Sequence, residues 1–368
     1  MQDFFLWFLL IFFTFFLILY FYLKCADEDS KLNNFFGFGA IFIVFIHILI
    51  FLLLIFQDLS LISNLLQLWI FSLCLPIILI GMIIIISTVI AYFCKYYFKE
   101  KNFSSFGNKM RIKLSERSKL RNDIYRKIPH ILIFIGLFVL WYIGVYFVKN
   151  VTGSTEGMIP FENNMLYLYF QILTEPNSVI EVLFSLGWFY YLLFFFFYSF
   201  SLCMLANEYT RKSKRIFFPF NIFCTILLCD EEKSGYGTYL YFAISHLFTA
   251  FLCPPMVLFT ILGISSIADL MTSQVGIRFG KNHIKWNEDK TWEGTLAGII
   301  GCFVISLFFT GLIWAFIFSI VFLLFDILTR KPINMSDNLL VPIGLAIIFV
   351  IIRFYFNLDY YTIILTWI

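Results

Sequence analysis

The chain has 368 residues, of which 61% are hydrophobic and 13% are charged, and its formal net charge at pH 7 is +3. A soluble domain contains roughly 45–50% apolar and roughly 25% charged residues, so this composition favours the lipid bilayer as the solvent of the fold. The small net charge gives no indication of nucleic-acid binding. The eight cysteines include no C-x-x-C pair and lie mostly in apolar runs, which favours buried thiols over a metal cluster or a disulfide framework.

Long apolar runs predict an all-α, polytopic membrane protein. A helix needs about 20 mostly apolar residues to cross the hydrocarbon core of a bilayer. The first run, 4–23, has no basic start and no small-residue cleavage site, so we interpret it as a retained span rather than a signal peptide. The run 216–229 is short, and nine or ten transmembrane helices are therefore expected. In chain order the predicted spans are 4–23, 35–56, 65–94, 128–148, 180–205, 216–229, 238–262, 293–311, 313–329 and 339–358.

The stretch 95–127 divides the chain, because it carries eleven lysines and arginines against three acids. With ten spans, all the strongly basic loops fall on one side of the membrane, which the positive-inside rule predicts to be the cytoplasm. Prolines 76, 219, 254 and 255 fall inside predicted spans and are expected to kink them. The predicted organisation is an N-terminal accessory membrane module of three helices (1–94), a basic cytoplasmic linker (95–120), a functional core (121–358) and a C-terminal tail (359–368).

The most polar segment of the core is "ADLMTSQVGIRFGKNHIKWNEDKTWEGT", residues 268–295. Residues 276–293 carry seven charges, and placing them near the bilayer centre would cost on the order of 20 kcal/mol at ~3 kcal/mol each. We therefore expect a loop in water at the cytoplasmic face. Its glycines allow positive φ and a close approach of amides to an anion, and its basic side chains can bind phosphate oxygens. These residues are Gly276, Gly280 and Gly294, with Arg278, Lys281, Lys285 and Lys290.

Two further features of this segment suggest a nucleotide site. Asp269 is placed at the end of a predicted span, where a hard cation such as Mg²⁺ could join it to a nucleotide. Thr291 or Thr295 is expected to cap the following helix, whose N-terminus favours an anion. The spacing of a Walker P-loop is missing. From the residues alone, a positive-inside loop with turn glycines explains the segment equally well.

Three other motifs occur in the core, namely "RKIPHI" (126–131), "NEYTRK" (207–212) and "SDNLLVPI" (336–343). Together with the polar segment, and in this order, they resemble the CTP-dependent lipid-alcohol kinases, which comprise dolichol kinases, phytol and farnesol kinases, and CTP-dependent diacylglycerol kinases. The resemblance covers 121–358, and Ala268 and Thr272 replace a glycine and an alanine of the family pattern. The residues that match its central motif are Asp269, Ser273, Gly276, Phe279, Gly280, Lys281, Lys290, Thr291, Glu293, Gly294 and Thr295.

The resemblance implies an enzyme that transfers the γ-phosphoryl group of CTP to the hydroxyl of a lipid alcohol such as dolichol, a shorter prenol or diacylglycerol, with Mg²⁺ or another divalent cation. Its partners would be the lipid, the nucleotide and membrane lipids, and its active site would face the cytoplasm from the cell membrane or the endoplasmic reticulum. The implied catalytic residues are Asp269, Lys290, Glu293 and His130, and the implied metal ligands are Asp269 and Asp337. The implied nucleotide-binding residues are Ser273, Gly276, Arg278, Gly280, Lys281, Thr291, Gly294, Thr295 and Asn338.

Simpler structural roles stay open for several of these residues. His130 can cap the start of a span, Glu293 can be an acid favoured by the helix dipole, and Asp337 can belong to a turn before a span. Glu208 and Arg211 of the second motif can form a structural ion pair. For the whole chain, the alternatives are a CTP-dependent cytidylyltransferase of the phosphatidate type and a non-enzymatic anion transporter whose gate is the polar segment.

Overall fold

The structure is a computed structural model that describes residues 2–26, 29–57, 62–98, 119–152, 188–213, 216–221, 224, 228, 232, 234–329, 331–360 and 363–364. These residues are almost entirely helical and contain one two-stranded sheet, so the predicted all-α class is confirmed. They form two compact units, Met1–Ser118 with Phe195–Ile244 and Lys119–Phe194 with Ser245–Ile368. Several predicted segments lie partly outside the described residues, namely the basic linker (99–118), the fifth span (180–187), the span 216–229 and the C-terminal tail.

Six helices in the described part of the chain are long and apolar enough to cross a membrane, which is fewer than the nine or ten predicted. They support the assignment of the chain as a multi-pass membrane protein. The six are Ser72–Phe93, Leu120–Val151, Leu192–Lys212, Pro255–Phe279, Trp292–Thr310 and Asp337–Phe356, and the shorter apolar helices are Leu9–Lys24, Lys31–Ile46, Thr238–Leu252 and Leu312–Leu328.

The predicted span 238–262 is wrong, because it consists of two helices. α10 (Thr238–Leu252) ends before Pro254, and α11 (Pro255–Gly263) begins with a proline, whose missing amide hydrogen is tolerated only in the first turn. Pro219 has a similar effect on the predicted span 216–229, in which residues 216–218 have no regular secondary structure and Pro219 and Phe220 form a turn.

The first half of the predicted loop 268–295 is also helical. α11 continues through a π-helical turn, η4 (Ile264–Ala268), into α12 (Asp269–Phe279). The backbone N–H of Asp269 donates to the carbonyl of Ile264, five residues earlier, which is the hydrogen bond of a π-helix. Asp269 therefore lies within a continuous helical rod and not at its end.

The first unit contains α1 (Gln2–Lys24), α2 (Lys31–Gln57), α3 (Ile62–Phe98) and most of α8 (Trp188–Lys212). α1 packs against both α2 and α3. The predicted accessory module, residues 1–94, lies wholly within this unit.

A fully buried carboxylate organises the end of α8 in the first unit. Glu208 forms an ion pair with Arg211 and accepts hydrogen bonds from the hydroxyl of Tyr239 and, at 3.1 Å, from the backbone N–H of Gly237. Arg211 also donates to the carbonyl of Gly235 at 2.9 Å. The E-x-x-R residues thus form the structural ion pair, and they fasten the segment before α10 to α8.

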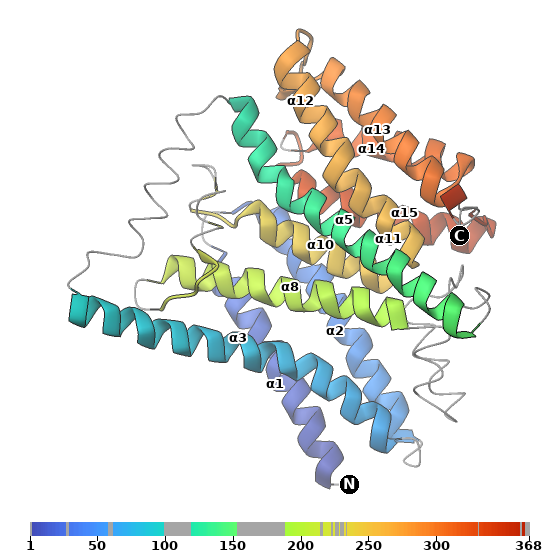
Figure 1. The fold of residues 1–368 in the computed structure, drawn as a ribbon. Helices are drawn as coiled ribbons and strands as arrows, with labels where there is room; N and C mark the ends of the chain where they lie inside the picture. Colours follow the sequence, from blue (N-terminus) through green and yellow to red (C-terminus); the bar gives the residue numbers. More distant parts are fainter. Residues whose placement is uncertain are drawn as a thin grey trace. The chain divides into compact units, whose positions relative to one another are not determined.

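The second unit is built around α13 (Trp292–Thr310). α13 packs against α11, η4, α12 and α14 (Leu312–Leu328), and α14 packs against α15 (Asp337–Phe356). α5 (Lys119–Thr152) packs against α11 and α12. Figure 1 shows α12 and α13 running side by side in orange.

A short hairpin joins α12 to α13. Its strands β1 (His283–Ile284) and β2 (Asn287–Thr291) are antiparallel, and the side-chain amide of Asn287 donates to the backbone carbonyl of Thr329 at 2.6 Å. The hairpin therefore lies beside the C-terminus of α14, and this end of the second unit is called the site end below.

The glycines of the polar segment serve helix packing. Gly276 and Gly294 lie inside helices and Gly280 has φ −62°, so none of the three adopts the positive φ that we expected. A Cβ on Gly294 would lie 2.6 Å from the carbonyl oxygen of Thr272, and a Cβ on Gly298 would lie 2.0 Å from Oγ1 of Thr272. Small residues thus let α12 and α13 approach closely, as is common between membrane helices.

Candidate functional site

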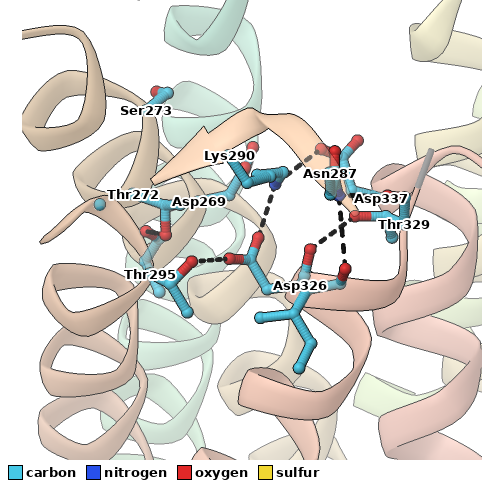
Figure 2. Close-up of polar contacts among 12 residues, drawn as sticks. Asp269, Thr272, Ser273, Asn287, Lys290, Thr295, Asp326, Thr329 and Asp337 are labelled. Atoms are coloured by element: carbon cyan, nitrogen blue, oxygen red, sulfur yellow. Dashed lines mark hydrogen bonds and ion pairs between the residues drawn. The ribbon is translucent and has the colours of Figure 1, made fainter. Parts of the chain in front are cut away.

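Lys290 joins three elements at the site end. It lies in β2, and its Nζ is 2.6 Å from Oδ1 of Asp326 in α14 and 3.6 Å from Oδ2 of Asp337 in α15. Figure 2 shows both carboxylates next to the ammonium group. Only 12% of the Lys290 side chain and 3% of the Asp326 side chain are exposed, so the shorter ion pair is largely shielded from water.

The sequence motifs do not assign Asp326, which stands as a lone acid in the apolar helix α14. Its Oδ2 accepts a hydrogen bond from Oγ1 of Thr295 at 2.7 Å, and this contact ties α14 to the start of α13. Its backbone carbonyl accepts from Oγ1 of Thr329 at 2.9 Å. The signal present in the sequence was the position itself, because a carboxylate inside a membrane helix is costly unless it is paired.

A second ion pair lies between α5 and α12. Nζ of Lys127 is 2.6 Å from Oδ2 of Asp269 and also donates to the carbonyl of Asp269 at 2.9 Å and to Oγ of Ser273 at 3.2 Å. Oγ of Ser273 donates in turn to Oδ2 of Asp123 at 2.6 Å. The first motif of the core therefore meets the polar segment through Lys127, and Asp123 is a further member that the motifs do not assign.

The carboxylates of Asp269, Asp326 and Asp337 line one small pocket, which α12, α14 and α15 form together with the π-helical turn. Its other lining residues are Ser265, Phe322, Asn338 and Val341. The space inside is about 10 Å³, which is enough for about one water molecule. A nucleotide does not fit into this space.

The carboxylates keep Lys290 charged. Burial by itself lowers the pKa of a lysine, but the negative charges of Asp326, Asp337 and Asp269 outweigh it and raise the pKa of Lys290 above its ordinary 10.5. With Lys127 included, the set brings together three carboxyl groups and two lysine amino groups.

These residues do not form a ready-made site for a divalent cation. The three carboxylates have the oxygen donors that Mg²⁺ prefers. However, ammonium groups already make their closest charge contacts, and within the described residues no group of three His, Cys, Asp or Glu side chains is close enough to hold one ion. The implied metal ligands Asp269 and Asp337 therefore line the same pocket without forming a resident metal centre in this arrangement.

The predicted helix cap is confirmed at Thr291. Its side-chain oxygen accepts from the backbone N–H of Gly294 at 3.3 Å, while Thr295 binds Asp326 instead. Glu293 accepts from the side-chain amide of Asn282 at 2.7 Å and from its backbone N–H at 3.3 Å. Glu293 thus fastens the start of the hairpin to α13, and it does not line the pocket.

Of the other predicted site residues, Asn338 lines the pocket, whereas Arg278, Lys281, Lys285 and His130 do not. Arg278, Lys281 and Lys285 are exposed, and their side chains make no hydrogen bond or ion pair with another described residue. His130 is buried within α5, where its carbonyl accepts from Oγ of Ser266 at 3.2 Å. Asn338 lines the pocket and donates its backbone N–H to Oδ1 of Asp337 at 2.9 Å.

Chemically, the cluster combines carboxylates that can accept a proton with an ammonium group that can neutralise an anion. Comparisons of the chain with known protein families, with curated proteins and with solved structures found no match. Helices and site together define a multi-pass membrane protein with a buried acid–lysine pocket at one end of its second unit.

Proposed function

We propose that the protein is a CTP-dependent lipid-alcohol kinase. The observation that carries the proposal is the convergence of Lys290 with Asp269, Asp326 and Asp337, which come from one strand and three helices. Two of the motifs that resemble this family supply Asp269, Lys290 and Asp337. The common position of these three residues at one pocket is what supports the proposal.

The position of the pocket suits substrates from two phases. A lipid alcohol dissolves in the bilayer with its hydroxyl near the headgroups, whereas CTP is confined to water. The pocket lies at the end of apolar helices, next to the hairpin and its basic side chains, so both molecules could reach it. Because the hairpin and the first turns of α5, which contact α12, carry basic side chains, we propose that this end faces the cytoplasm.

In the proposed reaction, the hydroxyl oxygen of the lipid forms a bond to the γ-phosphorus, the bond from that phosphorus to the bridging oxygen breaks, and CDP leaves. Asp269 or Asp337 would accept the hydroxyl proton. Lys290 would neutralise charge on the transferred group, since phosphoryl transfer depends mainly on positioning and charge stabilisation. The expected Mg²⁺ would arrive with the triphosphate, in keeping with the lack of a ready-made metal site among the described residues.

The test incubates membranes that contain the protein with γ-labelled CTP or ATP and a panel of lipid alcohols, and then identifies the labelled lipid. Asp269→Asn and Lys290→Ala are expected to abolish labelling while insertion and expression persist. Lys149→Gln, near the opposite end of α5, is the control and should retain activity. Normal turnover in folded Asp269→Asn protein would contradict the proposal, and release of pyrophosphate instead of CDP would indicate a cytidylyltransferase.

One observation favours the anion transporter as a second candidate. Transporters place buried charges and broken helices near the middle of the membrane, and the second unit has buried ion pairs beside a helical rod with a π-helical turn. Uptake of an anion by proteoliposomes, without any CTP turnover, would support this candidate and exclude the kinase.

A further inference from the structure

Three aromatic side chains mark the ends of neighbouring apolar helices at the site end. Phe279 is the last residue of α12 and Trp292 is the first residue of α13. Trp286, in the turn of the hairpin, donates its indole N–H to the carbonyl of Ile327 near the end of α14 at 3.2 Å. Phe279 is 64%, Trp286 48% and Trp292 46% exposed, so large apolar surfaces are held in place without cover from the described chain.

The length of the α11–α12 rod places this end at the membrane boundary. Pro255–Phe279 has 25 residues, which at 1.5 Å per residue span about 37 Å, whereas the hydrocarbon core is about 30 Å thick. The excess of about 7 Å is accommodated by tilting or by an end that reaches the headgroup layer, and the exposed Arg278 in the last turn of α12 favours the α12 end for the headgroup layer. Tryptophan is enriched at this depth, because its ring is apolar and its N–H is polar.

Basic side chains alternate with these aromatic residues. Arg278 precedes Phe279, Lys285 precedes Trp286, and Lys281 lies between the two pairs. All three basic side chains are exposed and make no ion pair with another described residue. The exposed acids Glu288 and Asp289 belong to β2, and Glu293, which accepts from Asn282, belongs to α13, so residues 278–286 themselves contain no acidic residue. Cationic side chains in the headgroup layer attract lipid phosphates, and anionic lipids strengthen the attraction.

We propose that residues 278–286 form an interfacial anchor, which is embedded in the headgroup layer and binds anionic phospholipid headgroups through Arg278, Lys281 and Lys285. The proposal does not depend on the kinase assignment. It has a consequence for the pocket, because Lys290 lies in β2 of the same hairpin. Anchoring the hairpin to the headgroups would hold Lys290 at a constant depth beneath them.

Tryptophan fluorescence in lipid nanodiscs tests the depth. Lipids that carry a bromine or spin-label quencher either near the headgroup or near the bilayer centre are compared for the wild type and for the variants Trp286→Phe and Trp292→Phe. The chain has eight tryptophans, so the emission of Trp286 and Trp292 is taken as the difference between the wild type and the double variant Trp286→Phe/Trp292→Phe. We expect headgroup-level quenchers to reduce this difference more strongly than the deep quenchers do. Trp141→Phe, at a buried position in α5, should leave that component unchanged. Two results would overturn the proposal. One is that acrylamide in the water quenches Trp286 and Trp292 while neither lipid-borne quencher does, and the other is that the quencher near the bilayer centre quenches them more than the headgroup quencher.

The charge preference is measured with the same fluorescence. Headgroup-level quenchers on an anionic lipid should quench the emission of Trp286, measured as the difference between the wild type and Trp286→Phe, more than those on a zwitterionic lipid at equal mole fraction. This difference should disappear in the double variant Lys281→Gln/Lys285→Gln and persist in Lys149→Gln, near the opposite end of α5. Equal quenching by the two lipids in the wild type would overturn the anionic recognition.

Discussion

Replacement of Lys290 by methionine gives the sharpest test of the buried cluster. Methionine keeps most of the length of the lysine side chain but removes the charge 2.6 Å from Oδ1 of Asp326, a carboxylate that is 3% exposed. Loss of one partner from a buried ion pair costs about 3–5 kcal/mol, because the remaining charge is left without compensation. At roughly 2–4 °C per kcal/mol, the melting temperature should fall on the order of 10 °C.

Buried cysteines provide the assay, because Cys25, Cys224, Cys253 and Cys302 react with a thiol-specific fluorophore only when the protein unfolds. The control is Lys281→Met, which removes an exposed lysine and should change the melting temperature little. The double variant Lys290→Met/Asp326→Asn should recover part of the loss, since it removes the uncompensated carboxylate. Equal shifts for the two lysine variants, or strict additivity in the double variant, would refute the ion pair.

Three further predictions use the same assay. Gly298→Ala should lose about 1–3 kcal/mol, because its Cβ would lie 2.0 Å from Oγ1 of Thr272, whereas Gly136→Ala, with no atom within 4 Å, should gain several tenths of a kcal/mol; a neutral Gly298→Ala would contradict the close packing. Thr291→Val should cost about 1 kcal/mol through loss of the helix cap, and Thr291→Ser should not; equal losses would argue against capping. Because the pKa of Lys290 is raised on folding, its contribution is complete below about pH 10.5 and is lost at higher pH. Above that pH the melting temperature of the wild type should therefore fall faster than that of Lys290→Met, and parallel curves would contradict the raised pKa.

Much of the fold followed from local features of the sequence. Apolar runs were sufficient to predict helices, since each run has to satisfy its backbone hydrogen bonds within the bilayer. The cap at Thr291 was predictable from a hydroxyl residue directly before an apolar run. The convergence of Asp269, Lys290 and Asp337 followed only from the order of the motifs, because nothing local relates residues so far apart in the chain.

Other features depend on partners that are distant in the sequence. Asp326 looks like an isolated charge until β2 brings Lys290 to it. Gly276 and Gly294 fit an anion-binding loop and a close helix contact equally well, and only the position of α13 against α12 decides between them. Residues 268–279 were predicted to form a loop because they are polar, but they are helical. A polar stretch can continue as a helix where charged side chains of neighbouring helices pair with its own.

The π-helical turn Ile264–Ala268 sets the rotational phase of everything after it. One additional residue in a turn rotates the following side chains by about 100° relative to an uninterrupted α-helix. A deletion of one residue within this turn would therefore swing Asp269 away from Lys127 while leaving the apolar face of α11 in register. A single continuous helical rod can in this way present a hydrophobic face in α11 and an acidic side chain in α12. The rotation about the helix axis that separates the two faces is set by the five residues of the π-helical turn.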